Sequence, residues 1–182
     1  MGETSAAFDR RFKEGFFLKY IQNVVIDIGC GDNPVSDECV KFDVALGNTD
    51  ATYMEGLADC SFDTVYSYHL LEHLAQPETA LKNWYRLVKP GGWLIVGVPH
   101  RDYYEKRKLL PSLFNPDHKT YWLPVWPEPP DTRGLLQTFM DVFGNSVCLH
   151  SLRVLDDGYI VDGRPNTHPV GEYTIEIIVR RV

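Results

Sequence analysis

The feature that most restricts the fold of this chain is an apolar strand that runs directly into a glycine turn. Residues 24–28 read Val-Val-Ile-Asp-Ile, a run that is short and apolar enough for a strand covered on both faces. Gly29 and Gly31 follow it, and because glycine has no Cβ the backbone there can turn sharply and approach a neighbouring group closely. The pattern predicts a buried sheet with helices packed against it.

Other strands and helices can be predicted from periodicity. Leu81, Trp84, Tyr85 and Val88 share one face of a helix, which Pro90-Gly91-Gly92 would end. Phenylalanines recur every four residues near the N-terminus and predict a helix within residues 1–22. The remaining predictions are strands at 40–44, 51–54, 64–68, 93–98, 147–155 and 173–179, and a helix at 132–143.

Strands that alternate with helices and glycine turns predict an α/β fold with a doubly wound, mostly parallel sheet of seven strands, the last one antiparallel. The intervals from Gly31 to Val40 and from Val44 to Thr52 are short. We therefore expect reduced first and second crossover helices. Ligands of such sheets bind beyond the carboxyl ends of the strands, where the strand order reverses.

The length of 182 residues suits a single domain spanning residues 1–182. One segment breaks its pattern: seven of the twelve prolines lie within residues 99–131, beside several tyrosines and tryptophans. Aromatic residues favour a packed segment over disorder. We interpret residues 100–131 as an insertion that forms a substrate lid, or alternatively as a hydrophobic cover for the sheet edge.

Bulk composition excludes several classes of protein. The net charge of −7 argues against non-specific nucleic-acid binding, which needs a basic surface. The four cysteines form no C-x-x-C pair and no zinc spacing, and the chain shows neither a signal peptide nor an apolar run long enough to span a bilayer. We expect a cytoplasmic protein without a membrane partner, whose oligomeric state cannot be inferred from the sequence.

Two acidic residues at strand ends indicate the kind of ligand. A dinucleotide site favours G-x-G-x-x-G, but Pro34 occupies the third glycine position, which disfavours an NAD-dependent oxidoreductase. Asp27 precedes the glycines and suits a cationic ligand better than a pyrophosphate. Asp43 ends the second strand, where a carboxylate can accept hydrogen bonds from both hydroxyls of a ribose or can cap a turn; we favour the ribose.

These motifs resemble those of class I, Rossmann-like methyltransferases of the methyltransferase-11 type. The matching segments are VVIDIGCGDNP (24–34), KFDV (41–44) and SFDTVYSYHLLEHLAQPETALKNWYRLVKPGGWLIVGVP (61–99). The resemblance implies S-adenosylmethionine (SAM) as cofactor and S-adenosylhomocysteine as product. It implies that Asp27, Gly29, Cys30 and Gly31 hold the methionine part of SAM and that Asp43 accepts hydrogen bonds from the ribose. It further implies that Glu55, Gly56 and Leu57 flank the adenine, and that Tyr68 and His69 lie near the reacting end of SAM.

Three histidines are candidates for a catalytic base. Methyl transfer is an in-line displacement that needs alignment of the acceptor, and a hydroxyl acceptor must also lose its proton. His69, His100 and His118 follow predicted strands or lie in the insertion, and histidine titrates near neutral pH. A lone histidine is, alternatively, a structural hydrogen-bonding group. We predict no metal site, because the spacing of His100, Asp102, Asp117 and His118 matches no metal motif.

The function that these patterns favour is methyl transfer to a hydroxyl or amine of a small molecule. The Asp117-His118-Lys119 element with its aromatic neighbours resembles methyltransferases of surface-polysaccharide and natural-product pathways, which implies a sugar-like or natural-product acceptor. One alternative is a macromolecular acceptor, although no Asn-Pro-Pro-Tyr element follows residue 68. The other is a non-catalytic SAM-binding protein.

Overall fold

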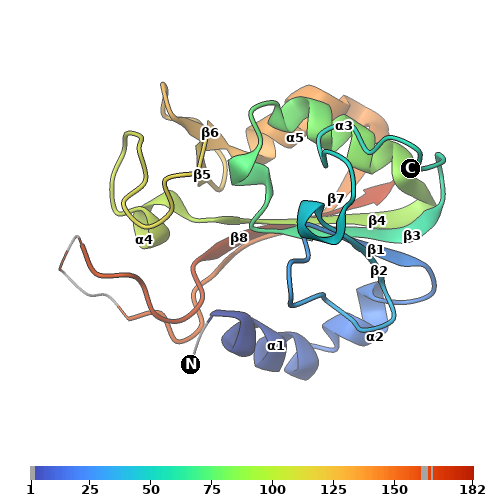
Figure 1. Cartoon of the computed structure of the whole chain (residues 1–182), viewed down its shortest axis with the longest axis horizontal. Coiled ribbons are helices and arrows are strands. Elements are labelled where there is room, and N and C mark those ends of the chain that lie inside the picture. Colours follow the sequence, from blue (N-terminus) through green and yellow to red (C-terminus); the bar gives the residue numbers. More distant parts are fainter. Residues whose placement is uncertain (1–2, 161–163, 165) are drawn as a thin grey trace.

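A six-stranded sheet organises the chain in a computed structural model that describes residues 3–160, 164 and 166–182 (Figure 1). The strand order is β2-β1-β3-β4-β8-β7. Strands β1 to β4 pair in parallel, and β8 is antiparallel to both of its neighbours. The predicted mostly parallel sheet with an antiparallel last strand is thus confirmed. The strands are β1 (Val25–Ile28), β2 (Val40–Phe42), β3 (Phe62–Tyr68), β4 (Val88–Pro99), β7 (Val147–Leu155) and β8 (Thr174–Arg181).

Helices cover both faces of the sheet (Figure 1). On one face α3 (Pro77–Leu87) and α5 (Leu135–Phe143) enclose the main core, in which Leu81, Trp84 and Phe139 are almost completely buried. On the other face lie α1 (Glu3–Lys13) and α2 (Phe16–Tyr20). The chain is therefore a three-layer α/β structure.

A second, smaller core lies between α2 and the sheet. Phe16 and Tyr20 pack against Tyr66, Ile95 and Ile178 of the central strands. The sequence predicts one helix within residues 1–22, and the structure has two, α1 and α2, which Gly15 separates with a left-handed φ of 68°. Residues 1–2 of that prediction lie outside the described residues.

The predicted seven-stranded sheet is wrong by one strand, because residues 51–54 form a turn. Side chains of α3 donate hydrogen bonds to backbone carbonyls that an edge strand would use to pair with its neighbour. The Trp84 indole donates to the Ala51 carbonyl at 2.8 Å, and Arg86 Nη2 donates to the Met54 carbonyl at 2.7 Å. Tertiary hydrogen bonds thus replace the ladder, and β2 becomes the sheet edge.

The predicted reduction of the first two crossovers is confirmed. Residues 29–39, all of them described, contain no helix between β1 and β2. The connection from β2 to β3 contains only a short 3-10 helix, η1 (Val44–Leu46). Both connections are therefore open loops at the carboxyl ends of β1 and β2, where a ligand is expected.

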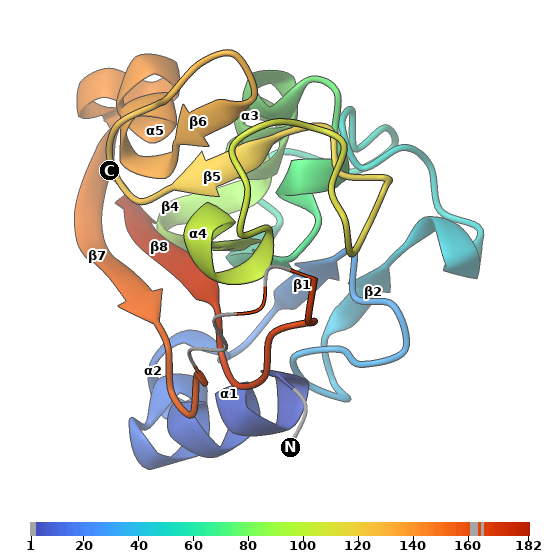
Figure 2. The ribbon, with the colours of Figure 1, turned by 90° about the vertical axis from the view of Figure 1, so that its left-hand side faces the viewer.

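The insertion at residues 100–131 is partly built into the core. It contains α4 (Arg101–Tyr104) and β5 (Tyr121–Leu123), and β5 pairs in parallel with β6 (Thr132–Gly134). Figure 2 shows α4, β5 and β6 grouped beside β4 and β8. Tyr121 and Trp122 are almost fully buried. The helix predicted from residue 132 begins at Leu135, because the preceding residues pair with β5 instead.

No helix among the described residues has the length and hydrophobicity required to cross a membrane.

We expect Trp84→Ala to lower the free energy of unfolding by about 3–5 kcal/mol, measured by urea denaturation. The substitution leaves a cavity beneath α3 and an unpaired carbonyl at Ala51. Trp126→Ala is the matched control, since that side chain is 69% exposed and its loss should change stability by less than about 0.5 kcal/mol. Equal effects of the two substitutions would contradict the assignment of Trp84 as the residue that anchors the turn.

Candidate functional site

A cavity of about 780 Å³ lies where β1 and β3 end, with α1 along one side. Of the predicted cofactor residues, five line this cavity: Asp27, Gly29, Cys30, Tyr68 and His69. Phe8 and Phe17 add aromatic surface from the N-terminal helices, beside Tyr66 of β3. The cavity therefore joins the glycine turn to an apolar, aromatic wall.

The two glycines of the turn have different physical roles. Both have left-handed φ angles, 76° at Gly29 and 51° at Gly31. A Cβ at Gly29 would lie 2.8 Å from Leu70 Cδ2, whereas a Cβ at Gly31 would meet nothing within 4 Å. Gly29 is thus required for packing against the segment after β3. Gly31 presents its backbone to open space, as close approach to a ligand requires.

Asp43 connects the end of β2 to this turn. Its Oδ2 accepts a hydrogen bond from Gly31 N at 3.0 Å, and its Oδ1 accepts one from Ala45 N at 2.8 Å. The turn-capping role considered from the sequence is therefore present. Each carboxylate oxygen retains a further acceptor site, so the ribose role stays a prediction.

Asp27 is a buried carboxylate at the floor of the cavity. Its side chain is 2% exposed, and Oδ2 accepts a hydrogen bond from Val35 N at 2.6 Å. Desolvation raises the pKa of Asp27 to about 7, although the Val35 N–H and the positive charge of Arg11 act in the opposite direction. A cation placed in the cavity would stabilise the charged form.

Arg11 is a cavity residue that sequence reasoning missed. It is 8% exposed, and its guanidinium carbon lies 4.3 Å from the centre of the Tyr68 ring. Neither Nε nor Nη2 has a hydrogen-bond acceptor among the described residues. In the sequence, Arg11 looks like an ordinary solvent-facing residue of a short amphipathic helix. Its burial becomes visible only when α1 is seen packed against the sheet. A buried cation with two unused donors is suited to an anionic ligand group.

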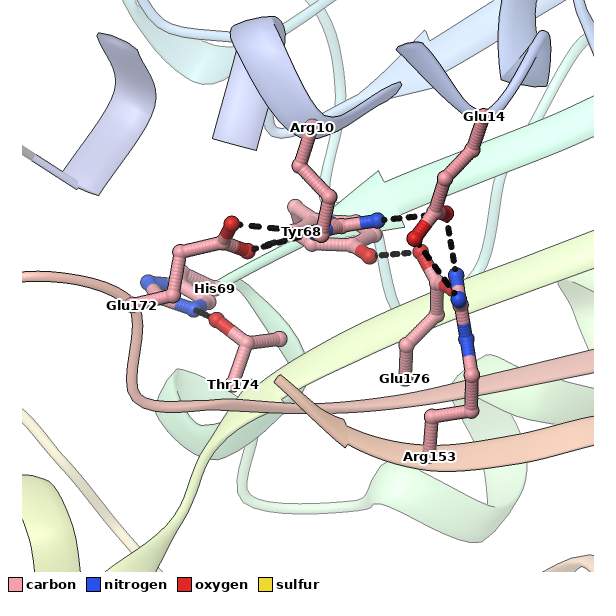
Figure 3. Close-up of polar contacts among 8 residues, drawn as sticks. All are labelled: Arg10, Glu14, Tyr68, His69, Arg153, Glu172, Thr174 and Glu176. Atoms are coloured by element: carbon pink, nitrogen blue, oxygen red, sulfur yellow. Dashed lines mark hydrogen bonds and ion pairs between the residues drawn. The ribbon is translucent and has the colours of Figure 1, made fainter. Parts of the chain in front are cut away.

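Tyr68 is held in place by an ionic network that runs through Glu176 and Arg153 to Glu14 (Figure 3). Its hydroxyl donates to Glu176 Oε2, and Arg153 Nη2 donates to Glu176 Oε1 at 3.0 Å. Arg153 in turn binds Glu14 of the loop after α1. Burial, and then the nearby charge of Glu176, raise the pKa of Tyr68, so its phenol remains protonated. Tyr68 can therefore donate a hydrogen bond but is unsuited to act as a base.

A second ion pair ties α1 to the segment before β8. Arg10 Nε donates to Glu172 Oε1 at 2.9 Å, and both side chains are buried (Figure 3). Arg10 and Arg11 are adjacent on α1, so this pair holds the helix over the sheet and thereby positions Arg11 at the cavity.

Of the three candidate bases, the structure places only His69 in the cavity lining. His69 follows β3 directly with a φ of 54°, and its Nε2 lies 2.8 Å from Thr174 Oγ1. Its ring is stacked with Tyr173 at 5.7 Å between centroids. The side chain is therefore fixed by packing and by a hydroxyl, which orients the ring.

The other two histidines are placed elsewhere. The His100 Nδ1 accepts a hydrogen bond from Asp102 N at 3.2 Å and so caps α4; burial lowers the pKa of His100. The His118 Nδ1 lies 2.5 Å from Glu105 Oε1, with both side chains buried. Neither histidine lines the cavity. A catalytic role for either residue stays a prediction.

The predicted adenine-flanking residues lie in the loop between β2 and β3. Gly56 has a φ of 80°, and the Leu57 carbonyl accepts a hydrogen bond from Arg86 Nη1 at 2.7 Å. The lining of the 780 Å³ cavity includes neither Asp43 nor residues 55–57. The ribose and adenine assignments therefore stay predictions.

Comparison with known proteins agrees with this architecture. Residues 34–96 match the family model described as a methyltransferase domain. A SAM-dependent methyltransferase from Archaeoglobus fulgidus superposes with a TM-score of 0.59 at 16% identity, over 97% of this chain and 93% of that one. The chain therefore has the fold of the class I, SAM-dependent methyltransferases, and residues 34–96 are similar to the methyltransferase-11 type. SAM is the cofactor of that family.

Two further similarities relate the chain to known proteins. A ubiquinone biosynthesis O-methyltransferase from Paracidovorax citrulli is 30% identical over 43% of this chain and 44% of that protein. The chain thus spans less than half the length of the curated relatives that it matches. A structure from work on the conversion of a disulfide bond into a thioacetal group during echinomycin biosynthesis has a TM-score of 0.62 at 17% identity, over 96% and 81% of the two chains.

The charges at the cavity are complementary to those of the amino-acid end of SAM. That end carries an ammonium and a carboxylate, and the cavity presents the carboxylate of Asp27 and the guanidinium of Arg11. Both side chains are buried, so each gains from a charged partner in the cavity. The glycine turn connects this end of the cavity to Asp43, because Gly31 N donates a hydrogen bond to Asp43 Oδ2.

The pKa of Asp27 leads to a prediction about pH and stability. The folded-state pKa is raised to about 7, and the unfolded carboxyl titrates near about 4. Between these values the folded state keeps a proton that the unfolded state has lost, so Asp27 costs stability progressively as the pH rises, and the loss is complete above about 7. Asp27→Asn should therefore be more stable than the wild type at pH 8 but not at pH 4, in urea titrations without cofactor.

Asp63→Asn is the control of opposite sign for this measurement. The hydrogen bond from Lys89 lowers the pKa of Asp63, so its contribution to stability is present above the ordinary carboxyl pKa and is lost as the pH falls. The Asn variant should be less stable than the wild type at pH 8, with the difference shrinking in acid. Parallel pH–stability curves for wild type and Asp27→Asn would contradict the buried, raised-pKa carboxyl.

Proposed function

We propose that this chain transfers a methyl group from SAM to a hydroxyl group of a small molecule. The observation that carries the proposal is the pair of opposite charges at one cavity: a buried Asp27 carboxylate and a buried Arg11 guanidinium with unused donors, beside a glycine turn. The volume of about 780 Å³ lies within the usual range for small-molecule sites. The named function of the curated O-methyltransferase relatives supports a hydroxyl acceptor.

In this proposal each residue has a defined task in holding the cofactor. Asp27 accepts hydrogen bonds from the ammonium, Arg11 donates to the carboxylate, and the backbone of Gly29 to Gly31 follows the methionine portion. Asp43 accepts from the ribose hydroxyls. When bound, SAM supplies an electrophilic methyl group on a sulfonium.

The proposed catalytic base is His69. A hydroxyl becomes a better nucleophile when its proton is removed, and a histidine does this near neutral pH. His69 lines the cavity, and its contact with the Thr174 hydroxyl orients the ring. His69 would take the proton of the acceptor hydroxyl as the methyl group is transferred.

The aromatic wall favours an acceptor with a ring. Phe8, Phe17, Tyr66 and Tyr68 line the cavity and offer faces for stacking on an aromatic or sugar ring. We propose a phenolic or sugar-like metabolite, and we propose that the insertion at residues 100–131 helps to select it. Non-catalytic SAM binding is the alternative, which turnover distinguishes.

Calorimetry should detect binding of SAM and of S-adenosylhomocysteine, and no binding of NAD. Arg11→Met should weaken SAM binding about 10- to 150-fold, because it removes a charge-assisted hydrogen bond worth about 1.5–3 kcal/mol. Lys13→Met, an exposed charge change on the same helix, is the matched control and should bind as the wild type does.

Asp43→Ala tests the ribose assignment in the same assay. Loss of acceptor oxygens for two ribose hydroxyls should weaken SAM binding more than tenfold. The same change also removes the bond to Gly31 N, so far-UV circular dichroism must show that the variant is folded. Wild-type affinity in a folded Asp43→Ala would contradict the ribose contact, and wild-type affinity in Arg11→Met would contradict the carboxylate contact.

His69→Gln tests the base. In an assay for S-adenosylhomocysteine release with pooled phenols and sugars, we expect kcat to fall about 10²- to 10⁴-fold with little change in SAM affinity. His100→Gln is the control, since His100 lies outside the cavity lining and should support wild-type turnover. Full turnover by folded His69→Gln would exclude His69 as the base, and SAM binding without turnover on any acceptor would favour the non-catalytic alternative.

A further inference from the structure

A compact histidine–carboxylate cluster lies outside the SAM cavity, between the segment after β3 and the insertion. Glu72 and His73 belong to η2 (Leu71–His73), and His118 comes from the insertion. His73 Nε2 and His118 Nε2 each lie 3.9 Å from the same oxygen, Glu72 Oε1. One ligand atom from each residue lies within 4.8 Å of the others, and none of the three residues lines the SAM cavity.

Each histidine of this cluster is oriented by a second carboxylate. The His118 Nδ1 lies 2.5 Å from Glu105 Oε1, and the His73 Nδ1 lies 3.1 Å from Asp117 Oδ2. Both Nδ1 atoms are therefore engaged by carboxylates, and both Nε2 atoms lie near Glu72. A carboxylate on the far nitrogen is the usual partner of a histidine that binds a metal, because it holds the ring and selects the tautomer whose Nε2 is free to coordinate.

The backbone holds these side chains together without a metal. Lys119 N and Thr120 N both donate to the Glu72 carbonyl, at 2.8 and 3.3 Å. This contact joins the insertion to η2 next to the cluster. The Glu72 and His118 side chains are 2% and 3% exposed, whereas that of His73 is 22% exposed, which leaves a route for an ion from solvent.

We propose that Glu72, His73 and His118 bind a divalent transition-metal ion, with zinc as the best match. Two nitrogens and one carboxylate oxygen form the three-ligand set found in one class of zinc sites, with water as the fourth ligand. Ligand atoms around tetrahedral zinc lie about 3.3 Å apart, whereas the two histidine–carboxylate separations are 3.9 Å and all three ligand atoms lie within 4.8 Å of one another. Shifts of about 1 Å or less in each side chain would therefore bring the three atoms to ligand spacing. Magnesium prefers oxygen ligands and fits this donor set poorly.

The site differs from the metal cluster rejected on sequence grounds. That candidate combined His118 with residues 100, 102 and 117, whose spacing matches no motif. In the folded chain His118 instead faces a glutamate and a histidine that precede it by more than forty residues, and Asp117 acts through His73. A bound ion would link the insertion to η2 through side chains as well as through backbone, and so would stabilise the insertion.

The test is a titration of the chelator-treated full chain with zinc. We expect one equivalent to bind with a dissociation constant below about 10 μM, and the melting temperature to rise with zinc concentration, because an ion that binds only the folded state stabilises it. Cobalt should bind in the same place and give the visible absorption of a tetrahedral nitrogen–oxygen site. Magnesium at millimolar concentration should not displace it.

Matched variants locate the ion. His73→Gln and His118→Gln should each weaken zinc binding at least about 100-fold, and Glu105→Gln, which alters only the residue that orients His118, should weaken it about 10- to 100-fold. His150→Gln, on the exposed face of β7, is the control and should bind zinc as the wild type does. His73 is the more exposed of the two histidine ligands, so its variant serves if His118→Gln fails to fold.

Two results would overturn the proposal: no stoichiometric zinc binding by the wild type below about 10 μM, or unchanged affinity in folded His73→Gln. The readouts are metal affinity, melting temperature and the cobalt spectrum, so they do not depend on methyl transfer. A chain that binds zinc but not SAM would refute the proposed function alone, and the reverse result would refute the metal site alone.

Discussion

Parallel pairing of β1 with β2 on one side and with β3 on the other is the constraint on which the site depends. The register pairs Ile28 with Phe42 and Asp27 with Tyr66, so all three strands end at the same edge of the sheet. Asp43 then follows β2 directly, where it accepts a hydrogen bond from Gly31. The first two crossovers, which the structure describes in full, contain no α-helix that could cover one face of the sheet at this edge. Helices α1 and α2 cover that face instead, and α1 brings the guanidinium of Arg11 to the cavity.

The N-terminal helices are held by charge pairs as well as by apolar packing. Arg10 binds Glu172, and Glu14 binds Arg153, which also contacts Glu176. The Arg10–Glu172 pair is buried, and removing one partner of a buried pair leaves an uncompensated charge, so this pair favours one docking position over others. The same network fixes the hydroxyl of Tyr68. The contacts that dock α1 therefore also shape the cavity.

The insertion joins the domain at two kinds of contact. Trp122 is buried in the main core, and the backbone of Lys119 and Thr120 bonds to Glu72 at the end of η2. These contacts bring the Glu105–His118 pair against Glu72 and His73. The insertion is thus anchored to η2, which follows the proposed base, His69, closely along the chain. A metal ion at the cluster would strengthen this anchor.

The sequence by itself determined the α/β class, the glycine turn, the acidic residues at two strand ends and the short crossovers, because each depends on local periodicity, backbone conformation or residue spacing. It did not determine that residues 51–54 form a turn, since hydrogen bonds from Trp84 and Arg86 are made only when α3 packs beside them. Nor did it separate His69 from His100 and His118, because residue type and strand-end position are shared by chemistry and by structural bonding. Only the tertiary structure decided that His69 and Arg11 line the cavity and that His118 lies beside Glu72 and His73. These contacts join residues that are distant in the sequence, and local sequence patterns carry no information about such contacts.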